Sequence, residues 1–352
     1  MKTVIPGMMV TVLAMAIVST NVRAEDASKA KNAPAATKVA YDTALAQAQV
    51  FEKAEKWKEA SASAEKALAS GWKETAAAIA LLERVDKHLV FQPGEKRTVS
   101  LGGGVDLELI WVPATTSEAW KKLSGGKDTF TMGSPETETN RADSEGPQHE
   151  VRFAKGFWMG KYEVMQGQYE RVMGEKENRS HWQGDDFPVE LVNWHKAREF
   201  CDKAGQSAGV RVRLPSEAEW EYACRAGTTG AFAGNLGDMG WYFTNGGGET
   251  HPVGQKKANP WGLYDMHGNV MEWCEDVGHD NYEGAPTNGS AWTSGANKDV
   301  RVMRGGSWNW AGGRCRSATR YWDLAHGVNM SLGFRVCVGT AMTSVPIKKT
   351  GE

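Results

Sequence analysis

The sequence predicts an α/β (α+β) domain with sparse regular secondary structure, preceded by a small helical hairpin region. The chain of 352 residues carries 15 Trp and 40 Gly. This combination is expected of a loop-rich fold, in which large aromatic side chains pack the core and glycine relieves the turns. Beyond residue 92 the strand-like runs are short and broken by Gly, Asn and Pro, whereas residues 39–89 are strong helix formers.

The N-terminus predicts export. Lys2 precedes an apolar stretch from Val4 to Val18, and Val22 and Ala24 stand where a signal peptidase cleaves. The apolar stretch is short for a membrane span. We therefore predict a signal peptide over residues 1–24 and a linker over 25–37. The mature protein would be periplasmic or secreted, with no stable membrane span after cleavage; a retained N-terminal anchor is the alternative.

Residues 38–92 predict a helical, tetratricopeptide-like hairpin region. Apolar residues recur there at helical spacing: Leu45, Val50, Phe51, Ala54, Trp57, Ala60, Ala64 and Leu68. Gly71 interrupts the pattern, and a third helix is predicted from about Thr75 to His88. Only one repeat copy is visible, and such arrays need neighbours to bury their faces. A spacer or capping hairpin is favoured over a partner surface.

We predict that residues 96–340 form the main domain and that residues 341–352 form a tail. Strand-like runs include Val105 to Val112 and Val151 to Phe153. Two helices stand out within the domain. Asn193 can cap a helix that runs through Ala204 and turns Ala197, Phe200 and Cys201 inward. Ser216 and Glu219 form a capping box for the helix that carries Trp220, Ala223 and Cys224.

The charge balance excludes one class of partner. Lys and Arg number 41 against 43 Asp and Glu, so the chain lacks the basic excess with which nucleic-acid binders neutralise phosphates. We therefore expect no nucleic-acid partner. The sequence does not indicate an oligomeric state.

Eight segments, in order, resemble the formylglycine-generating enzyme (sulfatase-modifying factor) family. The segments are Met132-Gly-Ser-Pro, Glu145-Gly-Pro-Gln-His149, Gly156 to Val164, Pro188 to Trp194, Arg213 to Tyr222, Gly262 to Trp273, Arg304-Gly-Gly-Ser-Trp308 and Gly333-Phe-Arg335. No single segment is decisive, but their common order over more than two hundred residues is specific. The resemblance implies a C-type-lectin-like fold.

The five cysteines suggest two disulfides and one free thiol in an exported chain. The sequence alone leaves the pairing open. The family resemblance implies that Cys201 pairs with Cys337 and Cys224 with Cys315. Cys274 would then be a buried thiol that fills space in the core.

The sequence lacks the intact catalytic cysteine pair of the family. The resemblance implies two cysteines in a C-x4-C pattern after a Gly-Gly-Ser turn, which bind copper(I) through thiolates. Counted from Ser307, Trp310 replaces the first cysteine and Cys315 falls on the second. If the motif is instead aligned backwards from Arg320, Cys315 no longer matches the second copper cysteine. It then matches the position where the structural disulfide of the family could form. On either count Cys315 is at most a catalytic remnant, and bound copper is not expected.

No other catalytic motif replaces the pair. The eight His residues form no cluster with metal-ligand spacing, and the sequence has neither a phosphate loop nor a Gly-x-Ser-x-Gly elbow. The resemblance implies a shallow peptide groove, for which the candidates are Trp308, Trp310, Arg304 and Arg320. The alternative is that Arg320 and Arg335 bridge loops to carboxylates such as Glu272.

One metal site carries over from the family. The resemblance implies a calcium turn with a side-chain oxygen of Asp265, the carbonyls of Met266, Gly268 and Val270, and a closing Glu272. Oxygen ligands on a turn suit the flexible coordination of calcium. The alternative is that Asp265 and Glu272 only cap the turn.

These observations favour an exported binding or maturation-accessory module, with a peptide or protein client and without copper oxidase activity. The alternative is an active oxidoreductase that converts a protein cysteine to formylglycine or performs a related oxidation. Trp310, in place of a cysteine, distinguishes the two hypotheses.

Overall fold

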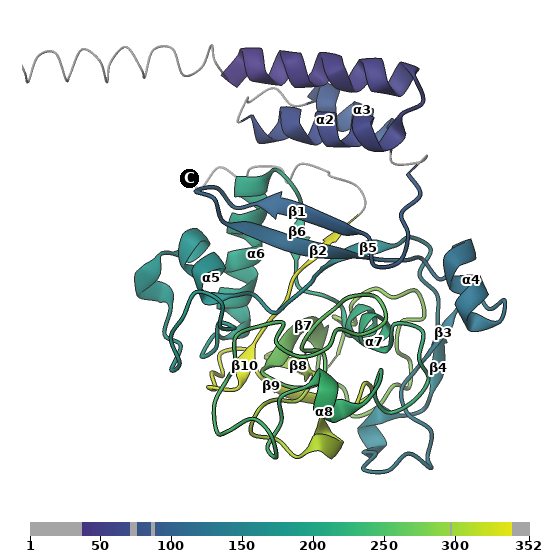
Figure 1. Cartoon of the computed structure of the whole chain (residues 1–352). Helices are drawn as coiled ribbons and strands as arrows, with labels where there is room; N and C mark the ends of the chain where they lie inside the picture. Colours follow the sequence, from purple (N-terminus) through teal and green to yellow (C-terminus); the bar gives the residue numbers. More distant parts are fainter. Residues whose placement is uncertain (1–36, 71–75, 86–88, 296–297, 340–352) are drawn as a thin grey trace, which may run out of the picture. The chain divides into compact units, whose positions relative to one another are not determined.

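A computed structural model describes residues 37–70, 76–85, 89–295 and 298–339 (Figure 1). The predicted signal peptide, all but the last residue of the predicted linker, and the predicted tail lie outside these residues. The chain divides into two compact units, residues 1–89 and 90–352. No described helix is long and apolar enough to cross a membrane.

Three helices make up the described part of the first unit. They span residues 37–53, Trp57–Ala69 (α2) and Ala76–Val85 (α3). Small side chains, including Ala48, Ala60 and Ala64, are fully buried between them. Val50, predicted on the apolar face, is instead 59% exposed. The buried positions of this helix are Tyr41, Ala44 and Ala48, and Val50 lies on the opposite face. The helix ends before residues 54–56, where Glu55 adopts a positive φ of 56°.

The described part of the second unit contains three sheets. The five-stranded sheet has the order β1-β2-β5-β11-β6, the four-stranded sheet β10-β7-β8-β9, and the third pairs β3 with β4. All pairings are antiparallel except that of β10 with β7. The strands are Lys96–Ser100 (β1), Asp106–Val112 (β2), Phe130–Met132 (β3), His149–Val151 (β4), Phe157–Gly160 (β5), Val212–Arg213 (β6), Met271–Val277 (β7), Val300–Arg304 (β8), Arg320–Leu324 (β9), Leu332–Gly333 (β10) and Cys337–Gly339 (β11).

The helices of this unit are short. They are Glu118–Ser124 (α4), Gln166–Met173 (α5), Trp194–Ala208 (α6), Glu217–Arg225 (α7) and Leu236–Met239 (α8), with 3-10 turns at Asp143–Glu145, Glu175–Glu177 and Gly312–Arg314. Figure 1 shows α5 and α6 on one side of the unit, and α4 with β3 and β4 on the other.

The two predicted helix starts are confirmed. The Asn193 side chain accepts a hydrogen bond from the Lys196 amide at 2.9 Å. Ser216 and Glu219 accept reciprocally from each other's amides, at 3.1 and 2.8 Å, which forms the capping box. The predicted strand at Val105 to Val112 is also found, whereas the run at Val151 to Phe153 contributes only its first residue to β4.

An aromatic core joins the sheets to α7. Trp220, Tyr222, Phe130, Phe153 and Trp261 are buried in one cluster, and the Tyr222 ring lies 4.9 to 5.0 Å from those of Phe130, Phe153 and Trp261. Such rings bury large areas at defined geometry. The core fixes α7, whose other face carries buried carboxylates.

Candidate functional site

The Gly-Gly-Ser turn folds tightly over Cys315. Gly305 and Gly306 have φ of 99° and 71°, a region that glycine adopts without strain. A Cβ on Gly306 would lie 2.5 Å from Cys315 Sγ, so the backbone touches the sulfur. Cys315 has no exposed surface, and burial raises the pKa of its thiol to about 12. The thiolate, the form that binds copper(I), is therefore disfavoured at neutral pH.

The second thiol in this region, Cys224, is equally unreactive. Its Sγ lies 3.6 Å from Ser317 Oγ and 3.7 Å from His267 Nε2. Burial raises the thiol pKa of Cys224 to about 12. The thiolate form of Cys224 is therefore disfavoured as well.

His267 does not act as a base toward Cys224. Its Nδ1 lies 2.8 Å from the Cys315 carbonyl and its Nε2 accepts a hydrogen bond from the Ala233 amide at 3.1 Å. Both ring nitrogens are thus engaged by the backbone in the neutral tautomer with the proton on Nδ1. Burial lowers the pKa of His267 to about 4. His267 is a structural group.

Neither predicted disulfide is present in the structure, where all five cysteines are buried free thiols. Cys224 contacts Ser317 and His267 instead of bonding to Cys315. Cys201 and Cys337 are likewise separate thiols, and burial raises both pKa values above the usual range. Cys274, expected to be free and buried, is both.

Arg304 and Arg320 do not line a groove. Both side chains are fully buried and form ion pairs with α7. Arg304 bonds to Glu221, while Arg320 holds both carboxylate oxygens of Glu217 at 2.7 Å. Glu217 and Glu221 lie one helical turn apart, so the same face of α7 receives both guanidinium groups. The prediction of a groove role for these two arginines is wrong, because they serve as buried counter-ions.

The alternative interpretation of the arginines is confirmed. Arg335 bonds to both oxygens of Glu272, at 2.6 and 2.7 Å, and to the carbonyls of Gly160 and Tyr264. Trp220 Nε1 donates to the same carboxylate at 2.7 Å. Arg335 therefore ties the chain after β10 to β7 and β5.

The two ends of the predicted calcium turn differ. Three donors from Arg335 and Trp220 occupy the Glu272 carboxylate, so Glu272 does not fit as a closing ligand. Asp265 accepts from the Gly254 amide through Oδ2 but leaves Oδ1 buried without a partner. Burial raises the pKa of Asp265 to about 6. Within the described ranges no group of three or more His, Cys, Asp or Glu side chains could hold a metal.

The two tryptophans predicted to line the groove belong to an aromatic surface. Trp308 packs against Trp182 with ring centroids 5.0 Å apart, and its Nε1 donates to the Met330 carbonyl at 3.2 Å. Trp310 packs against Tyr321 at 4.2 Å and accepts the Phe243 amide through its carbonyl at 2.9 Å. Two ring pairs, together with Phe243 and Met330 whose main chains bond to the tryptophans, are called the tryptophan surface here: Trp182, Phe243, Trp308, Trp310, Tyr321 and Met330.

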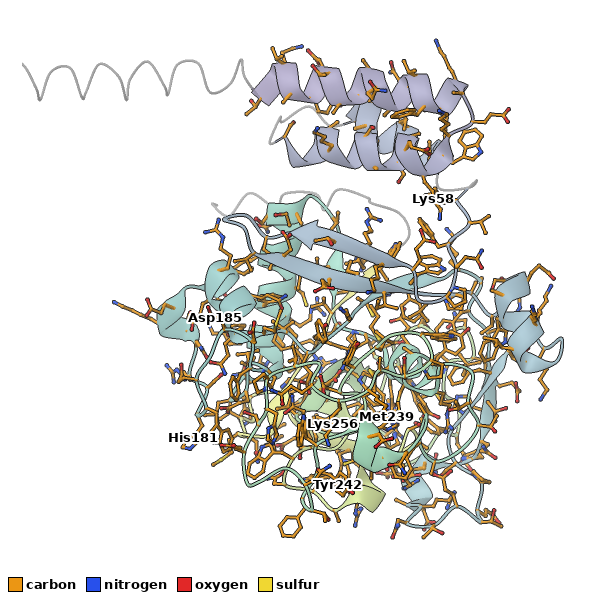
Figure 2. The ribbon with its side chains drawn as sticks, viewed as in Figure 1. Lys58, His181, Asp185, Met239, Tyr242 and Lys256 are labelled. Atoms are coloured by element: carbon orange, nitrogen blue, oxygen red, sulfur yellow. The ribbon has the colours of Figure 1, made fainter. Side chains whose placement is uncertain are left out.

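This surface is open to solvent. Phe243 is 72% exposed and Met330 42%, and the other four side chains are half-buried. Figure 2 places the chain neighbours His181 and Tyr242 in the part of the domain away from β1 and β2. Exposed aromatic side chains and methionine are enriched at protein interfaces.

Sequence reasoning missed several of these residues. Glu217 and Glu221 carry an i, i+4 signal on a correctly predicted helix, which could have identified them as partners for buried arginines. Trp182, Phe243 and Met330 come from three separate loops. No local pattern relates those loops, because only the tertiary fold brings them together.

Comparison with known proteins agrees with this architecture. Residues 115–340 match the sulfatase-modifying factor enzyme 1-like domain (FGE-sulfatase), and the chain belongs to this family. The fold is similar to that of PvdO from Pseudomonas aeruginosa, with a TM-score of 0.63, 28% identity and coverage of 71% of this chain and 100% of that one. The formylglycine-generating-enzyme-like, C-type-lectin-like α+β fold predicted from the sequence is thus confirmed.

Three relatives illustrate the range of the family. Chaperone protein LppX of Paenibacillus barcinonensis is 32% identical over 207 residues, which cover 43% of this chain and 69% of the relative. Inactive C-alpha-formylglycine-generating enzyme 2 of Bos taurus is 32% identical over 175 residues, covering 44% and 51%. Formylglycine-generating enzyme of Streptomyces coelicolor is 32% identical over 181 residues, covering 45% and 55%.

The coverage limits what these relatives imply. The chain spans about two thirds of LppX, about half of the two formylglycine relatives, and about a quarter of the chlamydial serine/threonine-protein kinases that it also matches. Family and fold are therefore shared, whereas an activity of this chain requires its own argument.

Proposed function

We propose that the chain is an exported binding or maturation-accessory module that engages a protein client through the tryptophan surface and lacks copper oxidase activity. The observation that carries the proposal is the state of the two thiols near the Gly-Gly-Ser turn. Cys315 and Cys224 are fully buried, and Trp310 supplies an indole, which is a donor and not a metal ligand.

The tryptophan surface supports the binding half of the proposal. Aromatic side chains and methionine are enriched at the centres of protein interfaces, where a few of them carry most of the binding energy. Two relatives are named as an inactive enzyme and a chaperone protein, and both descriptions are compatible with a role in binding. An extended client segment that packs against Trp308 and Trp310 would be bound through apolar contacts, and binding would not require a chemical reaction.

The binding role is tested with peptides selected from a library of short unstructured sequences on the full chain. We expect the double variant Trp308→Ala/Trp310→Ala to bind the selected peptides at least about tenfold more weakly. Truncation of central aromatic residues typically lowers the binding affinity by this much or more. Fluorescence polarisation measures the affinity, and the melting temperature shows whether each variant is folded.

Trp322→Ala is the matched control. Trp322 is 37% exposed on β9 but does not belong to the tryptophan surface, so its loss should leave the affinity unchanged. Equal binding by the wild-type chain and a folded double variant would place the client elsewhere.

We also propose that calcium binds at the turn through Asp265 and neighbouring backbone carbonyls, without Glu272. The unpartnered Oδ1 of Asp265 supports the proposal, since a hard oxygen ligand suits calcium. Chelation with EDTA should lower the melting temperature of the wild-type chain, and added calcium should restore it, because a ligand of the folded state stabilises it by mass action. Differential scanning fluorimetry measures the shift.

Asp265→Asn is the informative variant for this proposal. It should melt at the same temperature with and without chelator. Glu272→Ala would confuse the test, since it leaves the buried Arg335 without its carboxylate. A wild-type chain whose melting temperature ignores EDTA would show that the turn needs no ion.

A further inference from the structure

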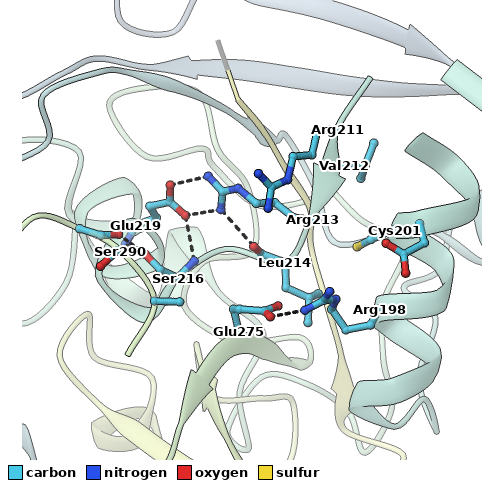
Figure 3. Close-up of a pocket in the computed structure, with 13 residues that line it drawn as sticks. Arg198, Cys201, Arg211, Val212, Arg213, Leu214, Ser216, Glu219, Glu275 and Ser290 are labelled. Atoms are coloured by element: carbon cyan, nitrogen blue, oxygen red, sulfur yellow. Dashed lines mark hydrogen bonds and ion pairs between the residues drawn. The ribbon is translucent and has the colours of Figure 1, made fainter. Parts of the chain in front are cut away.

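A cavity separate from the tryptophan surface lies between α6, β6, β7 and the start of α7 (Figure 3). Its volume is about 580 Å³, within the range of pockets that hold small ligands. Its lining residues are Arg198, Cys201, Asp202, Arg211, Val212, Arg213, Leu214, Ser216, Glu219, Glu275, Gly289, Ser290 and Ala291. None of them belongs to the tryptophan surface.

Two of the ion pairs in the lining are already closed. Arg213 holds both oxygens of Glu219 at 2.6 Å and donates to the Leu214 carbonyl at 3.1 Å. Arg198 bonds to one oxygen of Glu275. Figure 3 shows both pairs on the wall of the cavity. The Arg213 pair engages both oxygens of Glu219, whereas the Arg198 pair leaves one oxygen of Glu275 and further N–H donors of Arg198 for other contacts.

Three polar groups of the lining stay open. Glu275 Oε2 is buried and has no partner among the described residues. The exposed side chains of Arg211 and Asp202 make no hydrogen bond or ion pair with any residue that the structure describes. A buried carboxylate oxygen without a donor is costly, so a donor from a bound molecule would stabilise it.

The charges of the lining define the ligand. Three guanidinium groups and three carboxylates balance, which disfavours ligands with a large net charge of either sign. Among the described residues, the groups without a partner are one cation, Arg211, and two acceptors, Asp202 and Glu275 Oε2. Carboxylate pairs well with guanidinium, and ammonium supplies three donors to carboxylate oxygens.

We propose that this cavity binds a small zwitterion, the ends of a short peptide or a free α-amino acid, with its carboxylate at Arg211 and its ammonium group at Asp202 and Glu275. The cavity volume favours a short peptide over a single amino acid. The cavity is independent of the client site, so the double variant Trp308→Ala/Trp310→Ala should bind the same zwitterion with unchanged affinity.

Isothermal titration calorimetry on the full chain tests the proposal with tri-alanine as the probe. We expect tri-alanine to bind and N-acetyl-tri-alanine amide, which lacks both charged ends, to bind at least about tenfold more weakly, because charge-assisted hydrogen bonds are lost. L-alanine distinguishes the sources of the zwitterion: weaker binding than that of tri-alanine supports a peptide ligand, and equal binding supports a free amino acid.

The exposed lining residues provide variants that should fold. Arg211→Gln and Asp202→Asn should each lower the affinity for tri-alanine at least about tenfold. Lys203→Gln, next to Asp202 on α6 but outside the lining, should not. Any of three results would overturn the proposal. The first is no heat of binding with either tri-alanine or L-alanine. The others are equal affinity for N-acetyl-tri-alanine amide, and an unchanged affinity for tri-alanine in both lining variants.

Discussion

Replacement of Glu221 by Ala should reduce the free energy of unfolding by about 3–5 kcal/mol, because it leaves the buried Arg225 without its counter-ion and Arg304 with only the longer contact to Glu217 at 3.6 Å. Glu221 pairs with Arg304, whose side chain is fully buried, and with Arg225, and it also accepts the Gly133 amide at 2.9 Å. Urea unfolding followed by circular dichroism measures the loss.

Lys257→Ala is the matched control for a charge-pair deletion. Lys257 and its partner Asp238 are 75% and 51% exposed, and exposed pairs typically contribute less than about 1 kcal/mol. A loss in Glu221→Ala no larger than that in Lys257→Ala would show that the buried ion pairs do not hold α7 against β8.

Gly306→Ala should destabilise the chain by about 3 kcal/mol, because the new methyl group adds steric overlap to backbone strain. Gly306 has a φ of 71°, and its Cβ would approach Cys315 Sγ to 2.5 Å and Cys315 Cα to 2.9 Å. Thermal and urea unfolding of the variant measure the effect.

Gly247→Ala separates strain from overlap. Gly247 has a similar φ of 62°, but a Cβ there meets nothing within 4 Å, so only the strain of about 1–2 kcal/mol remains. If the two variants lose equal stability, the turn is not packed against Cys315 as described.

The fold was predictable because its signals are local. The capping groups at Asn193 and Ser216 act within one helical turn, and the ordered motifs identify the family. The N-terminal helices were predicted in type, but Val50 faces away from the buried positions of its helix, and a break follows at residues 54–56. Periodicity alone does not locate such a break, because Glu55 is an ordinary helix former.

The candidate site was predictable only in part. The sequence identified Trp308 and Trp310, which do lie on an exposed aromatic surface, and the loss of a cysteine at Trp310. It misplaced Arg304 and Arg320, since an arginine in a loop or strand carries no local sign of whether it faces solvent or a buried carboxylate. That outcome depends on α7, which presents Glu217 and Glu221 to both arginines across more than eighty residues of chain.

The central claim, binding without copper oxidation, is tested most directly by mass spectrometry of a cysteine-containing sulfatase peptide incubated with the reduced chain, copper(I) and oxygen. Because Cys315 and Cys224 are fully buried and Trp310 stands in place of a cysteine, the account predicts no stoichiometric copper binding and an unchanged peptide mass, also for Trp310→Cys. A mass loss that marks conversion of the cysteine to the aldehyde, dependent on copper and abolished in Cys315→Ser, would contradict the account and restore the oxidoreductase.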